Sequence, residues 1–99
     1  MKTALIIGGG PAGYTAAFLA SDRGMSVTLI DEAPRPGGVC LYRGCMPSKA
    51  LLHTARVIEE TKELQAAGLD FGPPVVNLER LRNWKENVVG QLTEGLTAL

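Results

Sequence analysis

A glycine-rich turn between an apolar run and a helix constrains this chain more than any other feature. Residues 3–7 are apolar and rich in β-branched side chains, which predicts a short buried strand. Residues 8–13 then read Gly-Gly-Gly-Pro-Ala-Gly, which fits the spacing G-x-G-x-x-G. Good helix formers continue from Pro11, which suits a first helical position, to Gly24, which is typical of a helix end. The order predicted is strand, tight turn and helix.

A second strand and an acidic residue complete this unit. Residues 26–30 predict a strand, and Asp31 stands at its carboxyl end. A carboxylate at this distance from a glycine turn accepts hydrogen bonds from a ribose in dinucleotide-binding folds. Glu32 is the neighbouring candidate, but side chains alternate along a strand, and we prefer Asp31. An acid here favours an unphosphorylated ribose, as in FAD or NAD, over NADP.

The glycines and the helix start predict a phosphate site. Gly8 allows the turn to tighten, Gly10 lets a pyrophosphate approach the backbone, and Gly13 lets the helix pack closely on the strand. The N–H groups of the first helical turn, which begins with Pro11 and Ala12, then attract phosphate. The alternative is a glycine turn without a ligand, but the flanking strands, the helix and the acid favour a nucleotide.

Both cysteines of the chain, Cys40 and Cys45, lie in one turn-rich segment, residues 37–49. Positions five apart in a regular α-helix have Cα atoms about 8 to 9 Å apart. A disulfide needs a Cα separation below about 7 Å. The two cysteines can therefore bridge only in a distorted turn, which Gly44 permits, with regular helix established around Pro47.

Lys49 distinguishes the two sulfurs. Cys45 is expected near a helix N-terminus, which favours its thiolate, and Lys49 follows one helical turn later on the same face. Cys40 comes earlier and is expected to be the more accessible sulfur. Inert thiols, a structural disulfide and a zinc site are the alternatives. A closed zinc site needs four ligands and His53 is the only histidine, so no metal is predicted.

The remaining residues predict two long antiparallel helices, so the fold class is α/β, with a Rossmann-like βαβ unit preceding a helical pair. Residues 47–67 favour a helix that stops near Gly68, and Asn77 is a good N-cap for the last helix. Apolar side chains recur at helical spacing and predict the core between the two helices, Trp84 included. These residues are Leu51, Ala55, Ile58 and Leu64 in the first helix, and Leu78, Leu81, Trp84, Val88, Leu92, Leu96 and Leu99 in the second.

Composition and charge narrow the class of protein. The 99 residues allow one small domain, and 10 basic residues balance 10 acidic ones, which argues against recruitment of nucleic acid or anionic lipid. No stretch approaches the roughly 20 apolar residues of a membrane span. The apolar run at the N-terminus is too short for a signal peptide. We therefore expect a cytoplasmic protein.

These motifs together resemble the pyridine nucleotide–disulfide oxidoreductases. The resemblance is carried by G-G-x-C-x-x-x-x-C-x-P-S-K at residues 37–49, placed after the glycine turn and Asp31. The continuation Pro-Ser-Lys-Ala-Leu-Leu is closest in style to the dihydrolipoamide dehydrogenase members. The resemblance implies that residues 1–99 are the N-terminal part of an FAD-binding domain, truncated relative to the much longer family members.

The resemblance also implies a role for each motif. The glycine turn would hold the FAD pyrophosphate and Asp31 the adenosine ribose. Cys45 would lie against the isoalloxazine ring and form a charge-transfer thiolate, Cys40 would exchange with the disulfide substrate, and Lys49 would lie near the reactive edge of the flavin. The implied cofactor-binding residues are Gly8, Gly10, Pro11, Ala12, Gly13, Asp31, Glu32, Gly37, Gly38, Val39, Cys40 and Lys49.

Two residues depart from the family pattern. Val39 stands where many members have threonine, and it cannot offer a hydroxyl near the flavin phosphates. Tyr42 stands where a small polar residue is common. Neither change removes the cysteine pair.

The implied activity is electron transfer between a dithiol, the Cys40–Cys45 disulfide, FAD and NAD. The substrate would be dihydrolipoamide or a lipoyl-bearing protein, and the full-length protein would be a homodimer. The family's NAD domain and C-terminal His–Glu pair are absent, so the chain alone is expected to be inactive. Its unpaired strand edges predict self-association. The alternative is a non-catalytic nucleotide-binding module whose cysteines are inert or form a redox switch.

Overall fold

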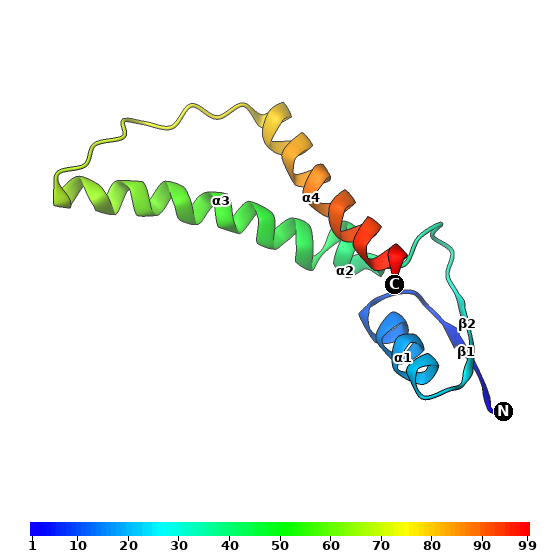
Figure 1. Cartoon of the computed structure of the whole chain (residues 1–99). Helices are drawn as coiled ribbons and strands as arrows, with labels where there is room; N and C mark the ends of the chain where they lie inside the picture. Colours follow the sequence, from blue (N-terminus) through cyan, green and yellow to red (C-terminus); the bar gives the residue numbers. More distant parts are fainter.

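The computed structural model describes all 99 residues and consists of a βαβ unit followed by a long helical arm (Figure 1). Strands β1 (Thr3–Ile7) and β2 (Ser26–Ile30) form a two-stranded parallel sheet. Helix α1 (Pro11–Asp22) connects the strands and packs against both of them. The predicted bounds of both strands are confirmed, as is the start of the first helix at Pro11. Gly24 has a φ of +84° directly after the end of α1, so it ends the helix as expected.

The cysteine segment folds as two helices with a break between them. Helix α2 (Gly38–Arg43) was not predicted, and α3 (Cys45–Glu63) begins two residues earlier than expected. The first N–H groups of a helix have no acceptor within it, so the missing N–H of Pro47 is tolerated in the first turn. The Ser48 N–H donates to the Gly44 carbonyl at 3.0 Å.

The end of α3 and the start of the last helix follow the expected signals. A 3₁₀ helix, η1 (Leu64–Ala67), continues from α3 and ends at Gly68, whose φ is +92°. Helix α4 (Leu78–Ala98) begins after Asn77, whose side-chain oxygen accepts from the Arg80 N–H at 3.0 Å. Helix α4 runs back towards α2, antiparallel to α3, as predicted (Figure 1).

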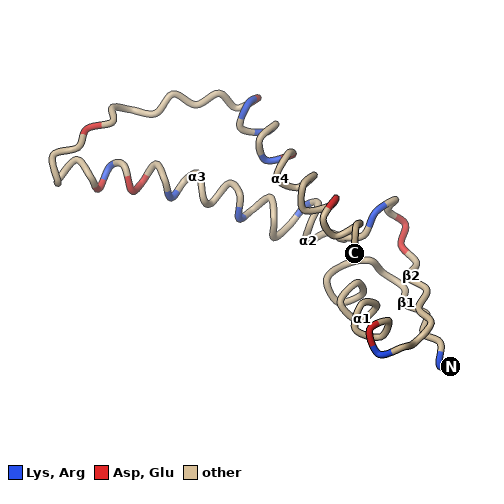
Figure 2. Tube along the Cα trace, in the orientation of Figure 1, with Lys and Arg blue, Asp and Glu red and all other residues tan.

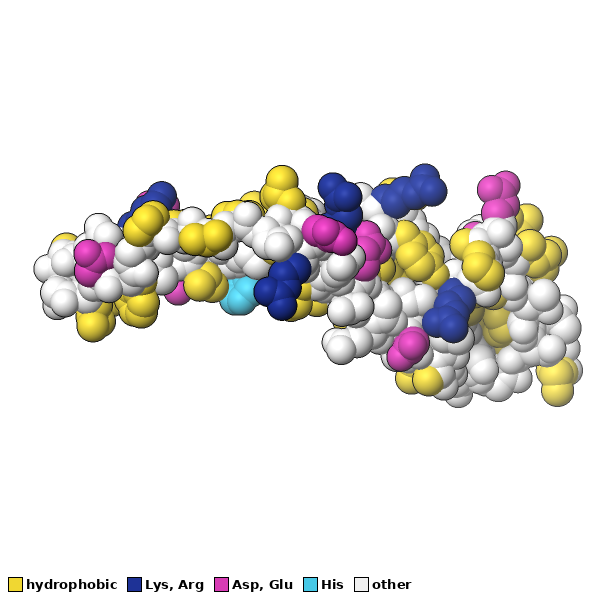
Figure 3. Space-filling model, turned by 90° about the horizontal axis from the view of Figure 1, so that it is seen from above, with side chains coloured by type: hydrophobic (Ala, Val, Ile, Leu, Met, Phe, Trp, Pro, Cys, Tyr) yellow, Lys and Arg dark blue, Asp and Glu magenta, His cyan; other side chains and the backbone are white.

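The predicted core stripes are confirmed only in part, because Ile58, Leu81, Val88 and Leu96 are half-buried. The buried residues of the two long helices are Ala50 in α3 and Val89 and Thr93 in α4, whereas Trp84 is 40% exposed. The buried positions of α3 and α4 carry small or medium side chains, whereas larger apolar side chains of both helices are exposed. Of the predicted stripes, Leu51, Leu64, Leu78, Leu92 and Leu99 are also exposed. Figure 3 shows hydrophobic side chains spread over the visible face of the molecule.

The molecule is elongated, with extents of 66 × 27 × 18 Å and a radius of gyration of 19.3 Å. A compact domain of about 100 residues has a radius of gyration of about 13 Å. Charged residues are concentrated on the helical arm and near the ends of the βαβ unit (Figure 2). No helix combines the length and the apolar composition that crossing a membrane requires.

Candidate functional site

The glycine turn joins the end of β1 to the start of α1. The Gly8 N–H donates to the Ile30 carbonyl at 2.7 Å, which ties the turn to β2. A Cβ on Gly13 would collide with the Gly8 carbonyl, so any side chain there would push α1 away from the turn. Pro11 and Ala12 are exposed in the first turn of α1, which contains no acidic residue. The free N–H groups of this turn therefore present an electropositive end to an anion.

Asp31 lies at the carboxyl end of β2 and is hydrogen-bonded to the glycine turn. One carboxylate oxygen accepts from the Gly9 N–H at 2.5 Å and the other from the Ala33 N–H at 2.9 Å. The Ala33 hydrogen bond, followed by that of Gly9, lowers the pKa of the Asp31 carboxyl below its usual value. A carboxylate has about four lone-pair positions, so acceptor capacity remains for ribose hydroxyls.

A cavity of about 570 Å³ opens beside Asp31. Its wall also contains Glu32, which is exposed and makes no hydrogen bond through its side chain, so both acidic candidates border the same space. The cavity is lined by Asp31, Glu32, Ala33, Pro34, Arg35, Gly38, Val39, Tyr42, Arg43 and Thr93. The volume lies within the range of ligand pockets in proteins.

The glycine pair that precedes Cys40, Gly37 and Gly38, crosses the glycine turn of residues 8–13. The Gly37 N–H donates to the Gly9 carbonyl at 2.7 Å. Gly38 has a φ of +65°, and a Cβ on it would lie 2.6 Å from the Gly10 Cα. Only a residue without a side chain fits this crossing. The backbones of both predicted glycine motifs therefore form one bare surface next to the start of α1.

The two cysteines flank the break between α2 and α3. Cys40 lies within α2 and Cys45 is the first residue of α3, so the expected distortion between them falls at Gly44. A Cβ on Gly44 would lie 3.2 Å from the Val39 carbonyl oxygen and 3.4 Å from the Cys40 Cα. Both cysteines are free thiols here. A side-chain hydrogen bond with Cys45, followed by desolvation, raises the pKa of the Cys40 thiol.

The relative exposure of the two cysteines differs from expectation. Cys40 is half-buried and Cys45 is exposed, so the prediction that Cys40 is the more accessible sulfur is wrong for this chain. Helix α4 packs against α2, the helix that carries Cys40. Cys40 borders an apolar groove of about 330 Å³, lined also by Tyr14, Leu41, Met46 and the C-terminal part of α4.

Lys49 lies in α3, one turn after Cys45. Its side chain is exposed and forms no ion pair. Its positive charge lowers the pKa of Cys40 and so partly opposes the effect of Cys45. An unpaired cation therefore lies one helical turn after Cys45.

The cavity is bordered by residues that the sequence predicted for the site and by others that it did not predict. Val39 is 73% exposed on the cavity wall and offers no polar group there. Arg43 and Thr93 also line the cavity, and no sequence signal distinguished them. Tyr42 was noted only as a departure from the family pattern, yet its hydroxyl is hydrogen-bonded to the loop that precedes Gly37.

Comparison with known protein families identifies the family to which the chain belongs. The family profile described as "Pyridine nucleotide-disulphide oxidoreductase" matches residues 2–99, and the chain belongs to this family. It is an oxidoreductase family, and membership implies FAD and NAD as cofactors.

Individual relatives narrow the similarity to one branch of the family. The chain is 50% identical over 95 residues to dihydrolipoyl dehydrogenase of Vibrio cholerae and 47% identical over 95 residues to that of Buchnera aphidicola from Acyrthosiphon pisum, with 96% of the chain covered in both cases. The crystal structure of LpdA from Mycobacterium tuberculosis matches 99% of the chain with a TM-score of 0.85 and 26% identity. The chain is thus dihydrolipoyl dehydrogenase-like. It spans about a fifth of the length of these proteins, 20% of the two relatives and 21% of LpdA.

The residues present are compatible with a flavin dinucleotide. The backbones of Gly10 and Gly38 pack directly against each other, so neither residue presents a side chain that would block the approach of a pyrophosphate. The N-terminus of α1 faces the same region, and Asp31 keeps acceptor positions for a ribose. Cys45 and Lys49 lie further along, at the start of α3. Asp31 and the glycine crossing therefore fit the ribose and the pyrophosphate of a dinucleotide.

Proposed function

We propose that residues 1–99 form the N-terminal part of an FAD-binding domain in a flavin-dependent disulfide oxidoreductase. Its substrate is a dithiol, dihydrolipoamide or a lipoyl-bearing protein, and its full-length form is a homodimer. One observation carries the proposal: two free thiols, Cys40 and Cys45, lie on either side of the helix break at Gly44, beside the crossing of the two glycine motifs. The choice of substrate is supported by the names of the relatives, which are dihydrolipoyl dehydrogenases.

The cysteine pair carries out thiol–disulfide exchange. In the oxidised state, a substrate thiolate attacks Sγ of Cys40, and Sγ of Cys45 leaves as the thiolate. The second substrate thiol then displaces Cys40 and closes the substrate disulfide. Two electrons pass from the dithiol to the cysteine pair, and one of the two cysteines takes up a proton as a thiol.

Neighbouring groups affect the protonation of Cys40. Hydrogen bonding to Cys45 and desolvation raise the pKa of Cys40, which favours its protonated thiol. Lys49 supplies the cation that stabilises negative charge beside the pair. When bound, the flavin supplies a two-electron acceptor. Asp31 and the glycine motifs orient the nucleotide through the ribose hydroxyls and the pyrophosphate.

The proposal is tested by absorbance spectroscopy of the full-length protein. Purified protein should contain bound flavin, and one equivalent of dihydrolipoamide should produce a long-wavelength band from the Cys45 thiolate. Cys45→Ser should keep the flavin but lose the band and the transfer of electrons from dithiol to flavin. Cys40→Ser removes the exchanging sulfur but keeps the thiolate, so it should lose turnover and retain the band.

Two results would refute this assignment. Full turnover by Cys45→Ser would exclude its role in electron transfer. A full-length protein without flavin and with unreactive thiols would favour the non-catalytic nucleotide-binding module. The 99-residue chain by itself should show no NADH-dependent disulfide reduction, because it contains no second dinucleotide-binding motif. Measurable NADH oxidation by the purified chain would contradict this.

A further inference from the structure

We propose that Tyr42 is a positioning residue that holds the loop of residues 32–36 in place and thereby slows the release of FAD. The inference rests on the proposed function, because it assumes that the nucleotide site takes FAD. It concerns a residue at which this chain departs from the small polar side chain common in the family.

The tyrosine hydroxyl is bonded to two successive carbonyl groups of the loop. It donates to the carbonyl oxygen of Arg35 at 3.0 Å and to that of Pro36 at 3.1 Å, so one proton is shared between two acceptors. Tyr42 itself lies in α2, and its side chain is half-buried. The ring therefore connects the short helix that carries Cys40 to the loop that precedes it.

The loop has few other hydrogen bonds to hold it. Residues 32–36 make no backbone–backbone hydrogen bond, and two of them, Pro34 and Pro36, have no N–H to donate. Within the loop, the only other bond is from the Ala33 N–H to the Asp31 carboxylate. Within residues 34–36, the only hydrogen bonds are therefore the two from the Tyr42 hydroxyl.

Both ends of the loop lead into the nucleotide site. Asp31 at one end and Gly37 at the other are each hydrogen-bonded to Gly9, through its N–H and its carbonyl respectively. Tyr42 and the loop residues line the same cavity as Asp31. A loop that moves away from α2 would pull on the ribose-binding carboxylate and on the glycine crossing together, which would open the nucleotide site.

The test compares Tyr42→Phe with the unchanged full-length protein. The substitution keeps the ring and removes the hydroxyl. The loss of one shared hydrogen bond should speed FAD release roughly 2- to 10-fold. Hydrogen–deuterium exchange of the peptide covering residues 32–36, measured on the FAD-free protein, should become faster. This second readout does not depend on activity or on bound cofactor.

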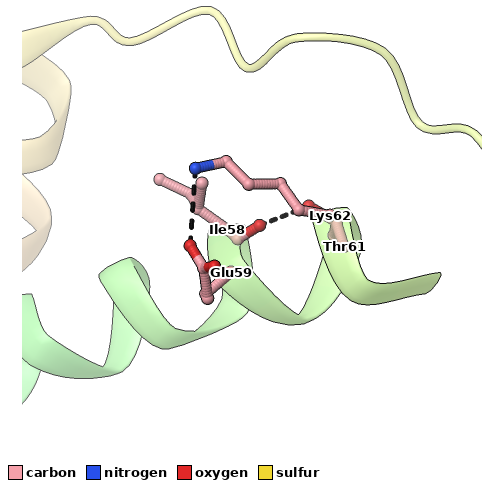
Figure 4. Close-up of polar contacts among 4 residues, drawn as sticks. All are labelled: Ile58, Glu59, Thr61 and Lys62. Atoms are coloured by element: carbon pink, nitrogen blue, oxygen red, sulfur yellow. Dashed lines mark hydrogen bonds and ion pairs between the residues drawn. The ribbon is translucent and has the colours of Figure 1, made fainter. Parts of the chain in front are cut away.

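A matched control removes another hydroxyl that is bonded to a backbone carbonyl. Thr61 in α3 donates to the Ile58 carbonyl at 2.7 Å, next to the Lys62–Glu59 ion pair on the helical arm (Figure 4). Thr61→Val should change neither FAD release nor exchange in the loop, because this bond lies far along α3 from the glycine turn.

The outcomes separate this inference from the proposed function. Faster FAD release together with faster exchange in Tyr42→Phe supports it. An unchanged release rate, or faster release without faster exchange in the loop, overturns the role of Tyr42 while leaving the proposed function intact. If the full-length protein without any substitution binds no FAD, both the role of Tyr42 and the proposed function are overturned.

Discussion

At the scale of single residues, one tight constraint in the site is the crossing of Gly38 over Gly10. A Cβ on Gly38 would lie 2.6 Å from the Gly10 Cα, and its φ of +65° disfavours any L side chain. Gly38→Ala should therefore lower the free energy of unfolding by roughly 1 to 3 kcal/mol. It should also weaken FAD binding in the full-length protein. Chemical denaturation and flavin titration measure the two effects.

Gly90 provides the matched control for this substitution. It lies inside α4, is exposed, and has open space where a Cβ would be placed. Gly90→Ala should therefore stabilise the protein by about 1 kcal/mol through helix propensity. If both substitutions shifted stability in the same direction, the crossing would not be the cause of the Gly38 effect.

The Asp31 carboxylate should make stability depend on pH. Its pKa is lowered in the folded state by the Ala33 and Gly9 N–H groups. A lowered folded-state pKa gives a stabilising contribution that is present above the unfolded pKa, about 3.9 for Asp, and is lost as pH falls through the folded value. Asp31→Asn should thus melt at a lower temperature than the parent protein at pH 7, with the difference shrinking below pH 4. A constant difference across this range would exclude the mechanism.

At the scale of elements, the start of α4 depends on one side chain. Asn77 caps the helix through its bond to the Arg80 N–H, and this bond is exposed. Asn77→Ala should lower the free energy of unfolding by about 1 kcal/mol, read from denaturant melts. Asn83 lies within α4 and is exposed. Asn83→Ala should be neutral or slightly stabilising because alanine is the better helix former, and an equal loss in both variants would argue against a capping role.

At the scale of the whole molecule, apolar surface is left without cover. Only 7 of 99 residues are buried, and Leu5 and Ile7 of β1 are exposed. A two-stranded sheet with open edges recruits further strands, so the chain should self-associate as its concentration rises, measured by light scattering. Leu5→Lys should raise the concentration at which association begins, whereas Asn87→Lys on the exposed side of α4 should not. A monodisperse monomer at high concentration would contradict this prediction.

The local elements of this protein could be read from the sequence because short-range interactions determine them. The glycine turn, Pro11, Gly24, Gly68 and Asn77 act within a few residues of where they stand, and each begins or ends an element as predicted. The buried faces of the long helices could not be read in the same way. Their register depends on which neighbouring helix approaches, and a stripe of large apolar residues satisfies more than one register.

The sequence alone determined the βαβ unit, the parallel order of its strands and the family, since these follow from spacing and residue type. Tertiary structure determined the contacts between segments, which the spacing of residues along the chain does not determine. It buried Cys40 more than Cys45, and it tied Asp31 to Gly9 across the turn. It also brought the Tyr42 hydroxyl to the preceding loop. Each of these depends on distances between segments that only the packed chain fixes.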